Sequence, residues 1–175
     1  HNGIEYADMQ LIAEAYLILK HIGHFNNHEL GKIFSEYQEG ELNSFLIRIT
    51  SEIFQEADDI TDQSLVDMIK DSAQQKGTGR WTSMEALKQG VDVSMIAAAG
   101  NARVMSNKET RKMANDHYPS LSIANISNPE ALIEDVRKGL YAAKIIAYAQ
   151  GFDLLKQASI AYGWDLPLGN IASIF

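Results

Sequence analysis

The sequence predicts an all-α fold, a multi-helix bundle with one long central helix. Apolar residues recur at spacings of three and four along most of the chain, which is the period of an amphipathic helix. The alternation of apolar and polar residues that is typical of a half-buried strand is almost absent. Asn128-Pro129, an N-cap followed by proline at the first helical position, opens a long proline-free stretch. That stretch predicts the central helix, over about residues 129–162.

The first half of the chain predicts three substantial helices and a shorter one. An apolar face of Ile4, Met9, Ile12, Ala13, Tyr16 and Leu19 predicts the first helix, which Gly23 ends. The second is expected after an N-cap at Asn27, and the sequence Glu39-Gly40-Glu41 breaks it. Apolar residues at spacings of three and four then predict the third. The expected ranges are about 4–20, 28–39 and 42–57, with a shorter helix over 65–69.

The second half predicts short helices on either side of the longest loop. A helix over 81–87 should stop near Gly90, and Ser94 is the expected cap of the next one, whose face of alanine and glycine permits close packing. A further short helix is expected over 107–115. Residues 116–128, which contain Pro119, have little periodicity and predict a loop. The central helix should end at Gly163, followed by a loop over 164–169 and the first turns of another helix over 170–175.

Composition limits the classes of function. The 175 residues suffice for one domain with a sizeable core, or for two small domains at most. A formal net charge of −8 argues against a general nucleic-acid surface or an anionic-membrane surface. A small anionic substrate stays possible, because it needs only a local positive pocket. We therefore expect neither nucleic acid nor membrane as a partner.

The absence of cysteine excludes disulfides and zinc–thiolate sites, and it fits a cytoplasmic location. No apolar run approaches the ~20 residues of a membrane span. The chain opens His1-Asn2-Gly3, without an initiator methionine or a signal peptide. We therefore expect a fragment of a longer protein.

Polar groups crowd the beginning of the first helix. His1 and Glu5 are four residues apart, as are Asn2 and Tyr6, so each pair lies on one side of the helix. Gly3 between them permits close approach by a ligand. These residues predict a binding site; the alternative is a capped, frayed helix start in which Glu5 interacts favourably with the helix dipole.

A second candidate site is the segment Gln75-Lys76-Gly77-Thr78-Gly79-Arg80-Trp81-Thr82. Its two glycines allow positive φ and close approach, Lys76 and Arg80 supply cations, and Thr78 supplies a hydroxyl. A helix N-terminus lies close by, so the combination suits a phosphate or a carboxylate. The spacing is not that of a P-loop. The alternative is a helix–helix loop with glycine caps and a solvated lysine.

Three histidines, His21, His24 and His28, suggest a metal site, but Gly23 and Asn27 separate them into a turn. A third or fourth ligand would have to be held nearby, so surface histidines are the better interpretation and we expect no metal. The acidic run 56–59 is interpreted as a solvated helix end. Arg103, near the end of its helix, is explained without function as an exposed cation.

Long stretches of the chain resemble 6-phosphogluconate dehydrogenase. The resemblance covers essentially the whole chain, in order. It is carried by His1-Asn2-Gly3-Ile4-Glu5-Tyr6-Ala7-Asp8-Met9-Gln10, by the segment from Gln75 to Thr82, and by Leu140-Tyr141-Ala142-Ala143-Lys144-Ile145-Ile146-Ala147-Tyr148-Ala149-Gln150-Gly151-Phe152. Two shorter stretches agree, Ser44-Phe45-Leu46-Ile47 and Gly169-Asn170-Ile171-Ala172.

The resemblance implies that residues 1–175 are the larger part of the family's helical C-terminal domain, which serves substrate binding and dimerisation, truncated at both ends. The family's NADP-binding Rossmann domain is absent here. So are the catalytic lysine, three positions before the match to His1, and a C-terminal tail that reaches into the partner subunit. The implied reaction, of the pentose phosphate pathway, is oxidative decarboxylation of 6-phosphogluconate to ribulose 5-phosphate with reduction of NADP. The implied assembly is a homodimer, and the fragment alone is expected to be inactive.

The resemblance also assigns residues. Glu5 matches the family's general acid, and His1 and Asn2 match contacts to the sugar acid near its reacting end. The groups that hold the 6-phosphate are matched by Tyr6, Lys76, Thr78 and Arg103. No residue is assigned to the cofactor, and the choice between NADP and NAD stays open.

Two departures from the family pattern, Asp92 and Phe175, are interpreted as structural and away from the site residues. Two other hypotheses remain. One is a related 3-hydroxyacid dehydrogenase acting on an unphosphorylated substrate, which would not need the Lys-Gly-Thr-Gly cradle. The other is a folding and dimerisation module with no activity of its own.

Overall fold

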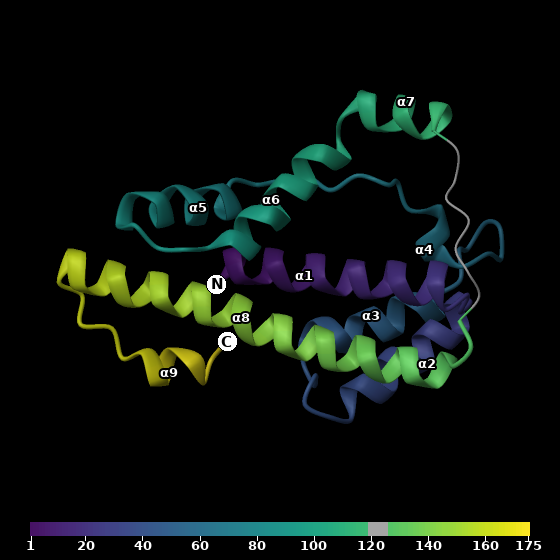
Figure 1. The fold of residues 1–175 in the computed structure, drawn as a ribbon, viewed down its shortest axis with the longest axis horizontal. Helices are drawn as coiled ribbons and strands as arrows, with labels where there is room; N and C mark the ends of the chain where they lie inside the picture. The colour runs from purple at the N-terminus through teal and green to yellow at the C-terminus, as the bar shows by residue number, and fades with distance from the viewer. Residues whose placement is uncertain (119–125) are drawn as a thin grey trace. The chain divides into compact units, whose positions relative to one another are not determined.

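The protein is described here by a computed structural model that covers residues 1–118 and 126–175. Its elements over these residues are α-helices and one short π-helix (Figure 1), so the all-α prediction is confirmed. In chain order they are α1 (Asn2–Leu17), η1 (Ile18–Ile22, the π-helix), α2 (Asn27–Gln38), α3 (Phe45–Gln55), α4 (Leu65–Met68), α5 (Thr78–Gln89), α6 (Ser94–Ser106), α7 (Glu109–His117), α8 (Pro129–Tyr162) and α9 (Leu168–Ala172).

The long helix α8 begins and ends where the sequence predicts. The Asn128 side chain accepts a hydrogen bond from the Ala131 backbone N–H at 3.0 Å, as an N-cap does. Gly163 follows the last helical residue with φ of 65°, the left-handed conformation that ends helices and favours glycine. The expected loop over 116–128 cannot be followed throughout, because its residues 119–125, Pro119 included, lie outside the described residues.

Several predicted helix starts are displaced. The N-cap of α2 is Asn26 and not Asn27: Asn26 accepts from the Glu29 N–H at 3.0 Å, and the Glu29 carboxylate accepts from the Asn26 N–H at 2.8 Å. This reciprocal capping box satisfies two N–H groups that the helix leaves free, which Asn27 could not do with its neighbours. Likewise α3 begins after a cap at Ser44, three residues later than expected for 42–57.

The start of α6 differs in a similar way. Ser94 is the first helical residue instead of the cap, and the Asp92 carboxylate accepts from its backbone N–H at 2.9 Å. An aspartate side chain two residues upstream thus supplies the acceptor that we had assigned to serine. The first helix is also interrupted: the Gly23 N–H donates to the Ile18 carbonyl at 3.1 Å, a five-residue spacing that makes residues 18–22 a π-helical turn.

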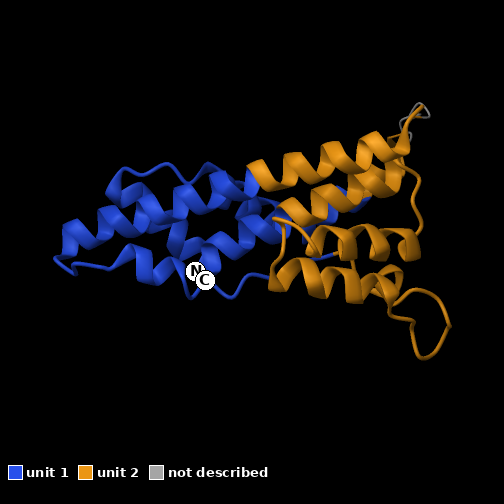
Figure 2. Cartoon of the chain, turned by 90° about the horizontal axis from the view of Figure 1, so that it is seen from below, with its two compact units in different colours: residues 1–10, 72–112, 143–175 blue, residues 11–71, 113–142 orange. Residues whose placement is uncertain are grey.

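The described chain divides into two compact units (Figure 2). Unit 1 comprises residues 1–10, 72–112 and 143–175, and unit 2 comprises residues 11–71 and 113–142. Helices α1 and α8 each supply residues to both units. The prediction of a single domain or of two small ones at most accommodates this division.

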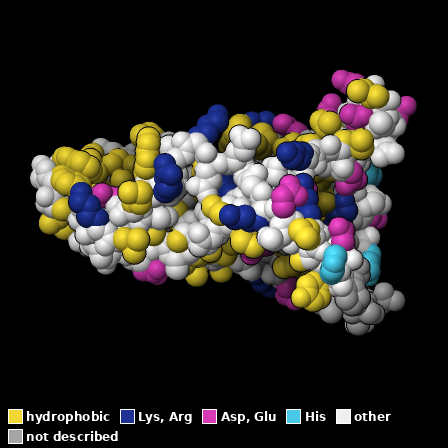
Figure 3. Space-filling model, turned by 90° about the horizontal axis from the view of Figure 1, so that it is seen from above, with side chains coloured by type: hydrophobic (Ala, Val, Ile, Leu, Met, Phe, Trp, Pro, Cys, Tyr) yellow, Lys and Arg dark blue, Asp and Glu magenta, His cyan; other side chains and the backbone are white. Residues whose placement is uncertain are grey.

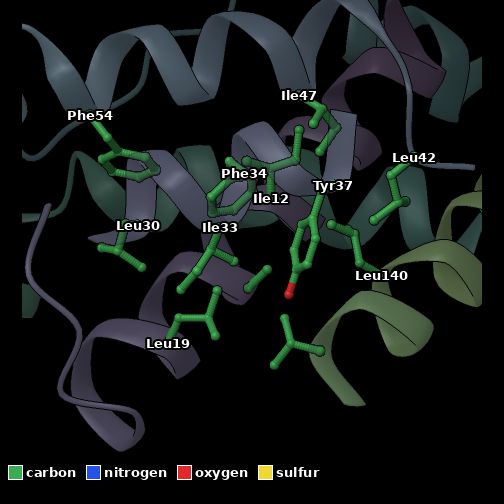
Figure 4. Packing of buried hydrophobic residues seen from close by; sticks show 12 residues of the cluster. Ile12, Leu19, Leu30, Ile33, Phe34, Tyr37, Leu42, Ile47, Phe54 and Leu140 are labelled. Carbon is green, nitrogen blue, oxygen red and sulfur yellow. The ribbon is translucent and has the colours of Figure 1, made fainter. Parts of the chain in front are cut away.

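Unit 2 is built on large apolar side chains (Figure 4). Phe34 on α2 is fully buried and packs against Tyr37 and Phe54, with ring centroids 5.5 and 5.6 Å away. Tyr37 also donates its hydroxyl to the Ile133 carbonyl of α8 at 2.6 Å. Other buried members of this core are Ile12, Ala15, Leu19, Leu30, Ile33, Leu42, Ile47, Val136 and Leu140.

Unit 1 has a core of smaller side chains. Ala7, Ala86 and Ala147 are almost fully buried in it, from α1, α5 and α8. The remaining buried members are Ile4, Val93, Ile96 and Leu154. Alanines at these positions let the three helices approach closely, so this unit fixes the backbone of α1 against its neighbours within the unit.

The surface carries mixed charge. On the face in Figure 3, basic side chains are interspersed with acidic and hydrophobic ones over the described residues. None of the helices in residues 1–118 and 126–175 combines the length and the apolar composition that a membrane crossing requires.

Candidate functional site

All the residues predicted to form a site lie in unit 1. Four stand at the beginning of α1 (His1, Asn2, Glu5, Tyr6), two at the beginning of α5 (Lys76, Thr78) and one in the last turn of α6 (Arg103). The start of α1 is therefore the segment on which the candidate site depends.

Neighbouring helices of unit 1 hold this segment on two sides. A Cβ atom placed on Gly3 would lie 2.5 Å from the Thr82 hydroxyl of α5, so α5 packs directly on the α1 backbone. On the other side, the ammonium of Lys144 on α8 donates to both carboxylate oxygens of Asp8 at 2.8 Å. Asp8 is only 3% exposed, and separating a buried carboxylate from the ammonium that pairs with it costs free energy. These contacts fix the first turns of α1.

His1 and Glu5 form the first part of the site. The His1 Nε2 and the Glu5 carboxylate are 3.4 Å apart, on side chains that are 53% and 38% exposed, so Glu5 has an open path to a ligand. The His1 ring also contacts the Phe175 ring edge-on, with centroids 4.9 Å apart. Our expectation that Phe175 lies away from the named site residues is therefore wrong.

Tyr6 and Arg103 form the second part. The Arg103 guanidinium carbon is 3.8 Å from the centroid of the Tyr6 ring, close enough for a cation–π contact. Arg103 also donates from Nη1 to the Gln74 carbonyl at 3.0 Å and from Nη2 to the Met9 sulfur at 3.4 Å. Arginine has five N–H donors, so these contacts leave others available to an anion.

The segment that carries Lys76 is tied to α6. Gln75 donates to the Gly100 carbonyl at 2.8 Å, and the Asn107 side chain donates to the Ala73 carbonyl at 2.6 Å. Arg103 also binds the carbonyl of Gln74, so Lys76 follows two residues along the chain after a residue that Arg103 contacts. Its own side chain is exposed, as is that of Asn2, and neither is joined to the other predicted residues by a hydrogen bond or ion pair within the described chain.

The two glycines of the segment play different parts. Gly77 has φ of 104° and is the N-cap of α5, so the helix begins at Thr78, earlier than the predicted Trp81. The first N–H groups of α5 therefore lie beside the half-buried Thr78 hydroxyl, in an arrangement suited to an anion. Gly79 is helical and buried. Its φ is not positive, so its lack of a side chain serves only to let neighbouring residues pack close to the α5 backbone.

Tyr148 on α8 is a titratable group that sequence reasoning did not assign. Burial raises the pKa of its phenol, and the carboxylates of Asp8 and Glu5 raise it further. Tyr148 therefore lies close enough to Asp8 and Glu5 for their charges to act on its phenol. Tyr148 lies in the stretch Leu140 to Phe152 that carries the family resemblance, which was a signal. Helical periodicity alone could not tell which side of α8 faces the site, because apolar residues cover more than one face of this helix.

Unit 1 also contains a largely apolar cavity of about 450 Å³. Its lining includes one predicted site residue, His1, and it is otherwise formed by Ile4, Thr82, Glu85, Gly151, Leu154, Leu155, Ala158, Tyr162 and Trp164. The other six predicted site residues are not among those that line this cavity. The described residues contain no cluster of three or more histidines or acidic side chains that could hold a metal ion.

The sequence matches a known family along its whole length. Residues 1–175 fit the family model described as the C-terminal domain of 6-phosphogluconate dehydrogenase. The chain belongs to the 6-phosphogluconate dehydrogenase family. The resemblance inferred from the motifs is thereby confirmed.

Individual enzymes of the 6-phosphogluconate dehydrogenase family are also similar to this chain in sequence. The NADP(+)-dependent, decarboxylating 6-phosphogluconate dehydrogenase of Bacillus subtilis (strain 168) is 49% identical over 177 residues, which are 100% of this chain and 38% of the relative. The NAD(+)-dependent, decarboxylating enzyme of the same strain is 47% identical over 178 residues, with the same two coverages of 100% and 38%.

A solved structure is also similar. It is that of Plasmodium falciparum 6-phosphogluconate dehydrogenase, described in its apo form, with its cofactor NADP+ and with its substrate 6-phosphogluconate. It matches with a TM-score of 0.93 at 46% identity, over 99% of this chain and 38% of that one. The chain therefore spans less than two fifths of the length of these relatives.

Proposed function

We propose that this chain is the helical, substrate-binding domain of a decarboxylating 6-phosphogluconate dehydrogenase that oxidises 6-phosphogluconate to ribulose 5-phosphate and reduces NADP. The observation that carries the proposal is the contact between Arg103 and Tyr6, beside the segment that holds Lys76 and Thr78. A dianionic phosphate is best bound by cations and hydroxyl donors fixed before it arrives. In a chain with a net charge of −8, such a local basic site selects anions without binding polyanions generally.

In this proposal Tyr6, Lys76, Thr78 and Arg103 hold the 6-phosphate. The substrate then extends along the first turn of α1, so that His1 and Asn2 contact the sugar acid near its reacting end. Glu5 lies one turn from His1 and is partly exposed, within reach of a bound sugar acid. The chain residues thus orient the substrate at both ends.

Glu5 supplies the proton of the last chemical step. Oxidation at the C3 hydroxyl gives a β-keto acid, which loses its C1 carboxylate as carbon dioxide and leaves an enediol. The enediol must be protonated at the former C2, which becomes C1 of ribulose 5-phosphate. When bound, NADP accepts the hydride of the first step; no residue of this chain is assigned to it. Since NADP- and NAD-dependent relatives match this chain at 49% and 47% identity, we assign cofactor choice to residues outside it. The chain alone is therefore expected to be inactive.

We further propose that the complete enzyme is a homodimer. Ile145 and Ile146 on the unit 1 part of α8 are 53% and 51% exposed, and a second copy would cover these apolar side chains. A cytoplasmic location stays a prediction, because relatives that match this chain include chloroplastic enzymes.

The phosphate site can be tested in the complete enzyme. We expect Lys76→Ala and Arg103→Ala each to raise KM for 6-phosphogluconate by roughly tenfold or more, since a charge-assisted hydrogen bond is made in both the ground and the transition state. Activity on unphosphorylated gluconate should change little. The matched control is Lys32→Ala, an exposed lysine of α2 in unit 2, which should leave both substrates unaffected. Equal losses on the two substrates would contradict the phosphate assignment.

A further inference from the structure

The Tyr6 ring lies between two elements of unit 1. On one side the Arg103 guanidinium stacks on it, with 3.8 Å between the guanidinium carbon and the ring centroid. On another side it meets Gly79 in the first turn of α5. A Cβ atom built on Gly79 would lie 2.5 Å from the Tyr6 Cδ2 and Cε2 atoms and 3.3 Å from Cγ. The ring therefore packs directly on the bare backbone of α5.

Backbone conformation does not explain a glycine at this position. Gly79 is helical, and the glycines with positive φ in the described chain are Gly77, Gly90 and Gly163. In a helix, glycine is less favourable than alanine by up to about 1 kcal/mol. The space that the Tyr6 ring occupies is what excludes a side chain here, because Tyr6 is itself only 9% exposed and has little room to move away.

The consequence concerns Arg103. Its guanidinium is held by one carbonyl, by the Met9 sulfur and by the face of the Tyr6 ring, and it forms no ion pair with a carboxylate in the described residues. The Tyr6 ring offers the largest contact surface of the three, so a shift of the ring would also shift the Arg103 guanidinium. Guanidinium binding to a phosphate depends on orientation as well as on charge, since the paired N–H groups must face the oxygens.

We infer that Gly79 is a positioning residue of the phosphate site: its missing side chain seats the Tyr6 ring against α5, and the seated ring presets the Arg103 guanidinium for the anion. The inference rests on the proposed function. It adds a residue that contacts neither substrate nor cofactor and acts through Tyr6.

The test uses the complete enzyme and the variant Gly79→Ala. We expect KM for 6-phosphogluconate to rise about tenfold, equivalent to about 1.4 kcal/mol, with kcat changed by less than about threefold. Values for unphosphorylated gluconate should stay at the wild-type level. The matched control is Gly139→Ala, a helical glycine with nothing within 4 Å of the new Cβ, which should change neither substrate. A parallel loss on gluconate would overturn the inference, because it would indicate a general disturbance of unit 1.

A double-mutant cycle tests whether Gly79 acts through the ring. Valine at position 6 ends near the position of the tyrosine Cγ, so Tyr6→Val removes Cδ2 and Cε2, the two atoms that lie 2.5 Å from a Cβ at position 79. Adding Gly79→Ala to Tyr6→Val should therefore raise KM less than about twofold further, a strongly non-additive result. Full additivity would overturn the inference. If Gly79→Ala alone did not fold, the double variant should fold and match Tyr6→Val, and its failure to do so would count against the inference.

The outcomes also separate this inference from the proposed function. If Arg103→Ala leaves KM for 6-phosphogluconate unchanged, the phosphate assignment itself fails. If Arg103→Ala raises that KM and Gly79→Ala does not, the assignment stands and the positioning role of Gly79 is wrong.

Discussion

Unit 2 is packed with large side chains, whereas unit 1 is packed with small ones. In unit 2, the Phe34 ring contacts Tyr37 on α2 and Phe54 on α3, and these rings fill the core by volume. In unit 1, alanines at positions 7, 86 and 147 take the central places, and the backbone at glycines 3, 79 and 151 lies directly against side chains of a neighbouring helix. The candidate site residues all belong to unit 1.

The two kinds of packing contribute differently to the protein. A core of large rings stabilises a unit mainly through buried apolar area. Close backbone packing adds less area but fixes the positions of helices, because a shift of a few tenths of an ångström already produces overlap. Unit 1 therefore has the rigid packing that a preorganised binding site needs, and unit 2 has the larger reserve of apolar burial. Substitutions that change the chemistry of a side chain, shorten it or enlarge it should therefore affect the two units differently.

The largest effect is expected from a change of chemistry in unit 1. In the complete enzyme, Glu5→Gln keeps shape and hydrogen bonding but cannot deliver a proton, so kcat should fall by the roughly 10²–10⁴-fold typical of a general acid. Binding of 6-phosphogluconate should change little. Steady-state kinetics and calorimetric titration measure the two quantities.

The matched control is Glu36→Gln, the same change on an exposed face of α2 in unit 2, which should leave turnover intact. Wild-type turnover in Glu5→Gln, or an equally large loss of affinity, would remove Glu5 from the acid role.

Truncation should be most costly in unit 2. Phe34→Ala removes a fully buried ring that contacts two others, and we expect the free energy of unfolding to fall by about 3–5 kcal/mol. Urea unfolding followed by circular dichroism measures the loss. Phe45→Ala is the control: that ring is 63% exposed, and its loss should cost less than about 1 kcal/mol. Similar costs for the two variants would show that the ring cluster does not carry the stability of unit 2.

Enlarging a buried side chain, by contrast, should destabilise unit 1. Ala147 on α8 is 0% exposed, so Ala147→Leu forces three methyl-sized groups into a filled core and should cost about 1–3 kcal/mol. Ala149→Leu places the same side chain on the exposed side of the same helix and should be close to neutral. A neutral Ala147→Leu would mean that unit 1 is loosely packed, against the view that close packing positions its site.

Periodicity and caps predict the helices well where the signals are local. Asn128-Pro129 and Gly163 mark α8 because a cap and a terminator act within one turn. The start of α2 was misplaced by one residue, although Glu29, the capping-box partner of Asn26, was present in the sequence. The π-helical turn at residues 18–22 has no comparable local signal, since α and π turns use the same residue types.

The site was predicted by motif rather than by geometry. Spacing of four residues correctly brings His1 near Glu5, because both lie on one helix. The contact of Tyr6 with Arg103 joins residues 97 positions apart in sequence number, and no local pattern could place them together. The pair Asp8–Lys144 was missed for the same reason, since a buried aspartate looks in sequence like any polar residue of a helix. Tertiary packing supplies this information.

The smallest effect expected is an acid-dependent contribution to unit 2 from Asp67. Its carboxylate accepts from the Lys20 ammonium at 2.7 Å and from the Asn27 amide at 2.7 Å. The bond from Lys20 lowers the pKa of Asp67; burial acts in the opposite direction, and the bond from Asn27 adds to the lowering. For Lys20, burial lowers the pKa, but the hydrogen bonds to Asp67 and Tyr16 outweigh it, and the pKa is raised.

These directions fix the pH window. An aspartate whose pKa is lower in the folded state stabilises the fold above its unfolded pKa of about 3.9, and this contribution is lost as the pH falls through the lower folded value. A lysine whose pKa is raised contributes fully below its unfolded value of about 10.4 and loses the contribution only as the pH rises through the higher folded value. Stability from this pair should therefore be flat between about pH 5 and pH 9.

Asp67→Asn tests this contribution. The Asp67 side chain is 45% exposed, so solvent screening limits the loss at neutral pH to less than about 1 kcal/mol. Urea midpoints at pH 7 and near pH 3 should differ less in Asp67→Asn than in the wild type, because the variant has no proton to take up at this site. Asp59→Asn changes an exposed aspartate of the loop that precedes α4 and should keep the wild-type pH dependence. Parallel pH profiles for the wild type and Asp67→Asn would show that the Lys20–Asp67 contact contributes nothing to unit 2 in solution.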